Sequence, residues 1–173
     1  MLANEAEHAL AEVALGRRRA QEHKGYAAAG SVLIVWGIVW FAANLISQFL
    51  PNFAGLAWSA GIVIATVWTV TRPRQVDDGR ILGTWLVIVV YMGITLAIVG
   101  ADVRMADFLI SLMVGATYLI VGIWAGLRFA LLGAALAAVA LIAWIAAPDF
   151  LFVLLAIGGG GTLIVGGLWL RRA

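Results

Sequence analysis

The sequence predicts an all-α integral membrane protein with six transmembrane helices, arranged as three parallel tandem helical hairpins, plus a short N-terminal amphipathic helix. Of its 173 residues, 64% are hydrophobic and 12% are charged, against about 45–50% and about 25% in soluble domains. One globular core of this size cannot bury that apolar excess, which argues against soluble enzymes and nucleic-acid-binding proteins. The apolar residues form six segments of membrane-spanning length, and positive charges alternate between the two sides of these segments.

Residues 1–24 are predicted to form a cytoplasmic amphipathic helix, followed by the transmembrane bundle in residues 25–173. Asn4 is placed as an N-cap with Glu7 as its capping-box partner, and Gly25 is expected to break or bend the helix before the first span. The helix carries the basic cluster Arg17, Arg18 and Arg19. Two interpretations are open: the helix lies on the membrane with this cluster on lipid headgroups, which is favoured, or it docks a partner protein.

The six predicted spans are each about 19–25 residues long, enough for a helix to cross about 30 Å of hydrocarbon. Only helices are plausible, because backbone groups in lipid must be paired within the segment. The spans cover residues 26–50, 53–71, 81–101, 108–127, 129–147 and 150–170. Every charged side chain is expected outside them, which argues against a proton-coupled carrier.

The distribution of positive charge predicts the orientation. With the N-terminus inside, ten of the eleven Lys and Arg residues are cytoplasmic and Arg104 alone is external. This is a positive-inside pattern, and it places both termini in the cytoplasm. The pI near 9.5 then reflects contact with anionic lipids of the bilayer and does not indicate a nucleic-acid partner.

An internal repeat supports the hairpin division into residues 26–72, 80–128 and 129–172. Each unit has an Asn or Asp followed by Phe in its external turn, and this polar residue, Asn52, Asp107 or Asp149, is predicted to cap the following helix. An early glycine marks the first helix of each unit, at Gly30, Gly83 and Gly133. Since each unit has two spans, all three units insert in the same sense.

The last pair of spans carries a resemblance to a known family. Gly133-Ala-Ala-Leu, Ala147-Pro148-Asp149 and Gly166-Gly167-Leu168-Trp169 resemble the HdeD-type acid-resistance membrane proteins, small bacterial proteins with six helices. The resemblance extends over residues 26–172 and leaves out the tail. It implies a stress-linked, multi-pass protein of the bacterial inner (cytoplasmic) membrane and supplies no catalytic residues.

A polar and aromatic stripe on the first span is one candidate site. Its members are four residues apart and share one helix face: Trp36, Trp40, Asn44 and Gln48. The stripe suits a pocket for a lipid, quinone or small amphiphile. Packing between helices is the favoured interpretation, because Asn and Gln commonly bond across helices in membranes.

Four consecutive glycines in the sixth span form a second candidate. Glycine inside a helix costs about 1 kcal/mol relative to alanine, so Gly158, Gly159, Gly160 and Gly161 need a reason to be there. They permit either a hinge that exposes carbonyl groups or, as we favour, close approach of two helices. Small-residue faces of this kind would serve a homo-oligomer as well as a monomer.

The chemistry missing from the chain narrows its function. There is no cysteine, and both histidines and the only lysine lie in the tail, so we expect no catalytic residues, metal site or cofactor. The sequence favours a non-enzymatic regulatory, stress-response or accessory subunit that contacts a cytoplasmic or membrane partner through residues 1–24. The alternative is a small permease or a lipid- or amphiphile-binding protein. A lipid-modifying enzyme is a distant third, since only Asp102, Asp107 and Asp149 are available outside.

Overall fold

The computed structural model describes residues 2–71 and 79–172, and for residues 2–25, 79–82, 84 and 124 it describes the helix without the side chains. No strand occurs in these ranges, which confirms the all-α class. The helices, with 3-10 turns η1 and η2 and a π-helical segment η3, are α1 (Leu2–Phe49), η1 (Pro51–Phe53), α2 (Ala54–Thr71), α3 (Gly79–Val99), α4 (Val103–Ala125), α5 (Leu127–Ala146), η2 (Pro148–Phe150), α6 (Leu151–Leu154), η3 (Leu155–Gly160) and α7 (Gly161–Arg171).

Five of the six predicted spans are helices long and apolar enough to cross a membrane. They are Tyr26–Phe49, Pro51–Thr71, Val103–Ile123, Leu127–Ala146 and Pro148–Arg171. The remaining predicted span, residues 81–101, is α3, whose apolar stretch within the described residues is the shorter Trp85–Val99. The main error in the boundaries is in α4, which begins at Val103 instead of residue 108.

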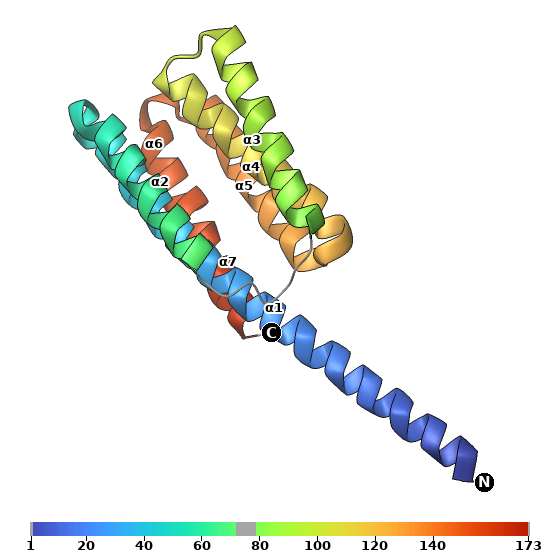
Figure 1. Ribbon diagram of the computed structural model, residues 1–173. Coiled ribbons are helices and arrows are strands. Elements are labelled where there is room, and N and C mark those ends of the chain that lie inside the picture. The colour runs from blue at the N-terminus through green and yellow to red at the C-terminus, as the bar shows by residue number, and fades with distance from the viewer. Residues whose placement is uncertain (1, 72–78, 173) are drawn as a thin grey trace.

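The tail and the first span form one continuous helix of 48 residues. The predicted break at Gly25 is therefore wrong. A single glycine raises the free energy of a helix by only about 1 kcal/mol, and the strong helix formers on both sides of it outweigh that penalty. Figure 1 shows the N-terminal half of α1 projecting straight beyond the bundle, past the C-terminus.

The two ends of the bundle differ in how the chain turns. We call the end with the turns at residues 50–53, 100–102 and 147–150 the distal end, and the end from which α1 projects the proximal end. Two distal turns are 3-10 turns that begin with Pro51 and Pro148, where a missing backbone N–H is harmless. In the third, α3 gives way to Gly100 with φ +60, a left-handed conformation that favours glycine.

The caps predicted for the distal turns are wrong. Asn52 and Asp149 lie inside η1 and η2, which begin without a side-chain cap, and Asp107 lies more than one turn inside α4. The cap of α4 is Asp102, whose side chain accepts a hydrogen bond from the Met105 backbone N–H at 2.8 Å. An apolar residue follows both Asp102 and Asp107, so the sequence pattern does not distinguish them. The prediction took Asp107 as the cap, and the structure shows that it is Asp102.

One set of close helix contacts joins α1 to η3 and α7. A Cβ added to Gly167 would meet the Gly30 carbonyl oxygen at 2.5 Å, and one added to Gly160 would meet the Gly37 carbonyl oxygen at 2.9 Å. Gly30 and Gly37 are seven residues apart, as are Gly160 and Gly167, so the two pairs set one antiparallel register. The first and last spans thus pack backbone to backbone, which small residues permit.

A second close pair joins α4 to α5, which belong to different predicted hairpins. A Cβ on Gly115 would meet the Gly133 carbonyl oxygen at 3.0 Å, and one on Gly122 would meet the Ala130 backbone nitrogen at 2.5 Å. Helices α1 and α2, and α3 and α4, also pack on each other, with less extensive contact. Hairpin connectivity therefore does not decide which helices pack most closely.

The interior and the outer faces have different side chains. A core cluster of large apolar residues joins α1, α4, α5 and α7, and includes Leu33, Trp40, Val121, Leu136 and Leu163. The outer faces of α2 and α3 expose large apolar side chains, among them Val63, Ile64, Leu86 and Ile98. Apolar faces of this extent are compatible with lipid contact and not with water.

The close approach at the glycine run predicts opposite effects at two adjacent positions. Alanine at Gly160 would meet only backbone atoms, the Gly37 carbonyl oxygen and the Phe41 nitrogen, both at 2.9 Å, whereas alanine at Gly161 would meet nothing within 4 Å. Gly160→Ala is expected to lower the free energy of unfolding by about 1–3 kcal/mol. Gly161→Ala, the matched control, is expected to leave it unchanged or raise it by up to about 1 kcal/mol.

Tryptophan fluorescence during unfolding of the two purified variants in mild detergent measures this difference. Equal stabilities for Gly160→Ala and Gly161→Ala would contradict the close approach of α1 and η3.

Candidate functional site

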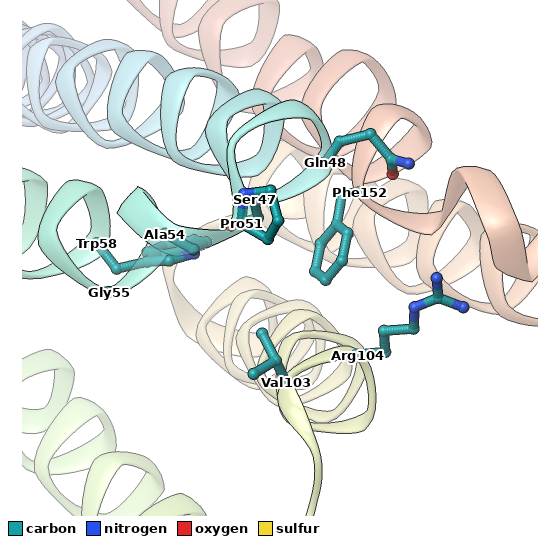
Figure 2. A pocket seen from close by; sticks show the side chains of 9 residues that line it. All are labelled: Ser47, Gln48, Pro51, Ala54, Gly55, Trp58, Val103, Arg104 and Phe152. Atoms are coloured by element: carbon teal, nitrogen blue, oxygen red, sulfur yellow. The ribbon is translucent and has the colours of Figure 1, made fainter.

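A cavity opens at the distal end, where α1, η1, α2, α4 and α6 meet. Its volume is about 460 Å³, within the range of about 300–1,000 Å³ typical of small-molecule sites. Figure 2 shows the nine lining residues: Ser47, Gln48, Pro51, Ala54, Gly55, Trp58, Val103, Arg104 and Phe152. The wall is mostly apolar with two aromatic rings, and only a few polar groups interrupt it.

Two of the residues that line the cavity, Gln48 and Arg104, contact Asp149. Gln48 donates from Nε2 to the Asp149 backbone carbonyl at 3.2 Å, and Arg104 Nη1 lies 3.7 Å from Asp149 Oδ1. The side chains of this ion pair are 52% and 87% exposed, so it adds little stability. Its effect is to balance the charge of Arg104 beside the cavity.

The stripe predicted on α1 is divided between different neighbours. Trp36 donates from Nε1 to Thr69 Oγ1 of α2 at 3.2 Å, which is a helix–helix contact. Trp40 is buried and packs edge-on against Trp58, with ring centroids 5.8 Å apart. Gln48 lines the cavity. The stripe thus begins with the contact of Trp36 to α2 and ends with Gln48 in the cavity wall. Trp40, between them, packs against Trp58, which also lines the cavity.

Asn44 is the fully buried member of the stripe, with 0% exposure. Its Nδ2 donates to the Trp40 backbone carbonyl at 3.0 Å, while its Oδ1 is buried and has no hydrogen-bond partner in the described part of the chain. Burying a polar atom without a partner is unfavourable by a few kcal/mol. Such an atom in a native bundle calls for an explanation, such as a water or a ligand.

Asn44 is one of three residues near the distal end that bury unpartnered oxygen atoms. In the described structure no partner exists for Asn44 Oδ1, Gln48 Oε1, or either carboxylate oxygen of Asp107. We call these three residues the acceptor layer. Trp40 Nε1, an unpartnered donor, lies beside it. Gln48 lines the cavity, and Asn44 and Asp107 lie about one helical turn further along α1 and α4 from residues that line it, Gln48 and Val103.

Asp107 is the residue that sequence reasoning placed wrongly. It was predicted to lie outside the spans as a cap, but it lies within α4 and is only 4% exposed. The prediction that every charged residue lies outside the spans is therefore wrong. The sequence does contain a signal for this position, because Asp102 is also followed by an apolar residue. If Asp102 is taken as the cap of α4, Asp107 falls inside the helix.

The glycine run lies at an irregular part of the helix and includes a close helix contact. Gly158, Gly159 and Gly160 end the π-helical segment η3, where the helix is locally widened, and Gly161 begins α7. Segments of this type often occur at functional sites. Gly160 makes the close approach to α1, and a Cβ on Gly159 would lie 3.5 Å from Trp40 Nε1. The segment η3 therefore packs against Trp40, the residue that contacts Trp58 of the cavity wall.

At the proximal end, Arg128 is held between aromatic rings instead of reaching freely toward headgroups. Its guanidinium carbon lies 5.5 Å from the Tyr26 ring centroid and 5.2 Å from that of Trp169, in cation–π range. Tyr26 also donates its hydroxyl to the Ala125 carbonyl at 3.0 Å. These contacts close the α4–α5 turn, where Gly126 has φ +115.

The third candidate from the sequence, the cluster Arg17, Arg18 and Arg19, lies on the projecting half of α1. Its side chains fall outside the described part of the structure. Among the described residues, no group of three or more His, Cys, Asp or Glu side chains is placed to hold a metal ion. Comparison with protein families, curated proteins and solved structures finds no match to this chain.

The corrected cap predicts unequal effects for three substitutions. Asp102→Ala removes the bond to the Met105 N–H and is expected to lower the free energy of unfolding by about 1 kcal/mol. Asp102→Asn keeps an acceptor there and should be near wild type. Asp107→Leu removes a buried, unpartnered carboxyl group and should not destabilise. Thermal unfolding in detergent measures all three, and a larger loss for Asp107→Leu than for Asp102→Ala would contradict this assignment.

Proposed function

We propose that the chain is a multi-pass protein of the bacterial inner membrane, built as three tandem hairpins with both termini in the cytoplasm. The support is the charge distribution, with ten of eleven Lys and Arg residues on one side, and the five long apolar helices. In this orientation the proximal end is cytoplasmic, the cavity opens on the outer side, and the tail helix enters the cytoplasm.

We propose further that the protein is a non-enzymatic regulatory, stress-response or accessory subunit that contacts a partner protein through residues 1–24. The observation that carries this proposal is the continuity of α1 across Gly25. A helix that lies on the membrane surface must turn out of the direction of the span before it. Because α1 does not turn (Figure 1), its first 24 helical residues, Leu2–Gly25, extend about 36 Å beyond the span at 1.5 Å per residue. A helix held away from the membrane is accessible to a partner.

Affinity purification from native cells in mild detergent tests this function. The full-length chain is expected to retain a stoichiometric protein partner, identified by mass spectrometry, and a chain lacking residues 2–24 is expected to lose it. Gly25→Pro breaks the helix at its junction with the span and should weaken recovery of the partner. Gly25→Ala, the matched control, preserves the helix and should not.

The results separate a docking helix from other roles of the tail. Loss of the partner with the deletion but not with Gly25→Pro would mean that the tail sequence matters and its rigid projection does not. Recovery of the same proteins with both chains would contradict the proposal.

A second candidate function is binding of a small amphiphile, and the cavity of about 460 Å³ favours it. An apolar wall with Trp58 and Phe152 suits an apolar body, and the polar side chains of Gln48 and Arg104 in the lining suit a polar head. In the proposed orientation the cavity opens near the outer membrane–water boundary, where amphiphiles concentrate.

Leucine substitutions test the second candidate. Gln48→Leu and Asn44→Leu are expected to reduce the amount of co-purified lipid or small molecule severalfold, measured by mass spectrometry, while the folded bundle survives. Thr71→Val is the control, because Thr71 is at the proximal end of α2 and its hydroxyl bonds the Val67 and Trp68 carbonyls of its own helix. If the leucine variants raised the unfolding temperature and left ligand recovery intact, the polar residues would be packing groups and not a site.

A further inference from the structure

We propose that the distal cavity binds a lipophilic organic cation, and that Asp107 is the counter-ion for its charge. This inference rests on the second candidate function, amphiphile binding, and names the class of ligand. The residues that select the charge are the acceptor layer, and the residues that hold the apolar groups are the aromatic walls of the cavity.

The position of Asp107 on α4 directs it inward. Val103 lines the cavity, and Asp107 lies four residues further along the same helix face. Continuing inward, Ile110 and Val114 pack against the core cluster that contains Trp40. Asp107 therefore stands on the interior face of α4, one turn deeper than the cavity wall, and its 4% exposure agrees with this position.

The register of α1 against α4 brings Asn44 to the depth of Asp107. At the proximal end, Tyr26 bonds the Ala125 carbonyl; at the distal end, Ser47 and Arg104 line one cavity. The two helices are antiparallel, and 21 residues separate the two levels on each of them. Three residues inward from the cavity, α1 reaches Asn44 and α4 reaches Asp107. The unpartnered oxygens of Asn44 and Asp107 thus come from two helices at one depth, and Gln48 lies one turn nearer the distal end, in the cavity wall.

Among the residues whose side chains are described, no cation pairs with Asp107. The spans of α1 from Tyr26 to Phe49, α2, α6 and η3 contain no charged residue, and the only charge on α5, Arg128, is at the proximal end between aromatic rings. Arg104 is close in sequence, but its guanidinium faces Asp149. A buried carboxylate without a partner is strongly unfavourable, so a cationic ligand would gain the interaction that the protein leaves open.

The remaining groups favour an organic cation over a metal ion. Four unpartnered oxygens, on Asn44, Gln48 and Asp107, attract positive charge, and an aromatic face such as that of Trp58 or Phe152 adds cation–π attraction. A bare metal ion would leave a cavity of about 460 Å³ almost empty. An ion with apolar substituents would fill it.

Two probe ions of nearly equal size and shape but opposite charge test the inference on the full-length protein in detergent. Equilibrium dialysis is expected to show tetraphenylphosphonium binding at least tenfold more tightly than tetraphenylborate. Asp107→Asn, which keeps the shape of the side chain, should weaken tetraphenylphosphonium binding at least tenfold and leave tetraphenylborate unchanged or tighter. Asp102→Asn removes an exposed carboxylate nearby while keeping the cap, and should change neither.

The outcomes separate this inference from the function on which it rests. Equal binding of both ions, insensitive to Asp107→Asn, would overturn the role of Asp107 while leaving amphiphile binding intact. Binding of neither ion to the wild-type protein would count against the inference and the second candidate function together. Thermal unfolding of Asp107→Asn, expected to match the wild type, shows that lost binding is not lost folding.

Discussion

The backbone approach of α1 to η3 and α7 is the constraint on which the rest of the bundle depends. Apolar side chains do not drive helices together in lipid, because lipid tails are equally apolar, so close packing and hydrogen bonds must do so. Gly30 with Gly167, and Gly37 with Gly160, allow that packing. The same register continues to Gln48 and Asp149, eleven residues beyond Gly37 and eleven before Gly160, where the Gln48 side chain bonds the Asp149 carbonyl.

Because α1 is fixed in this way, one helix serves several parts of the molecule. It packs on α2 and α7, supplies Ser47 and Gln48 to the cavity, and continues without a break into the projecting tail. The tail and part of the cavity wall therefore belong to a single continuous helix. A shift of the span of α1 along its axis would have to break the close contacts at Gly30 and Gly37.

Near the distal end, unpartnered buried oxygens lie close to buried hydroxyl groups that have partners. The hydroxyl groups of Ser47, Ser111 and Thr117 bond carbonyls of their own helix. Asn44 and Asp107 keep oxygen atoms without partners. Buried polar groups in native proteins usually have hydrogen-bond partners, and sites where they lack them are expected to be functional. The unpartnered oxygens therefore indicate a ligand site more strongly than the larger apolar faces do.

Much of the fold follows from the sequence alone. Composition and the spacing of apolar runs predict a helical membrane protein, because a helix must span a fixed thickness with its backbone bonds internal. Alternating charge predicts orientation. Helix ends were harder: Asp102 and Asp107 are chemically equal candidates for a cap, and only the folded chain shows which one accepts from a backbone N–H.

Tertiary structure alone decided how the helices are assembled. Glycines mark helix faces that permit close approach, but the sequence does not say which two faces meet. Gly30 packs against Gly167 of the last span and not against a residue of its own predicted hairpin. The cavity likewise depends on residues from five separate elements. Local patterns determine the helices because their bonds are local; contacts between distant segments depend on shape complementarity, which no single segment contains.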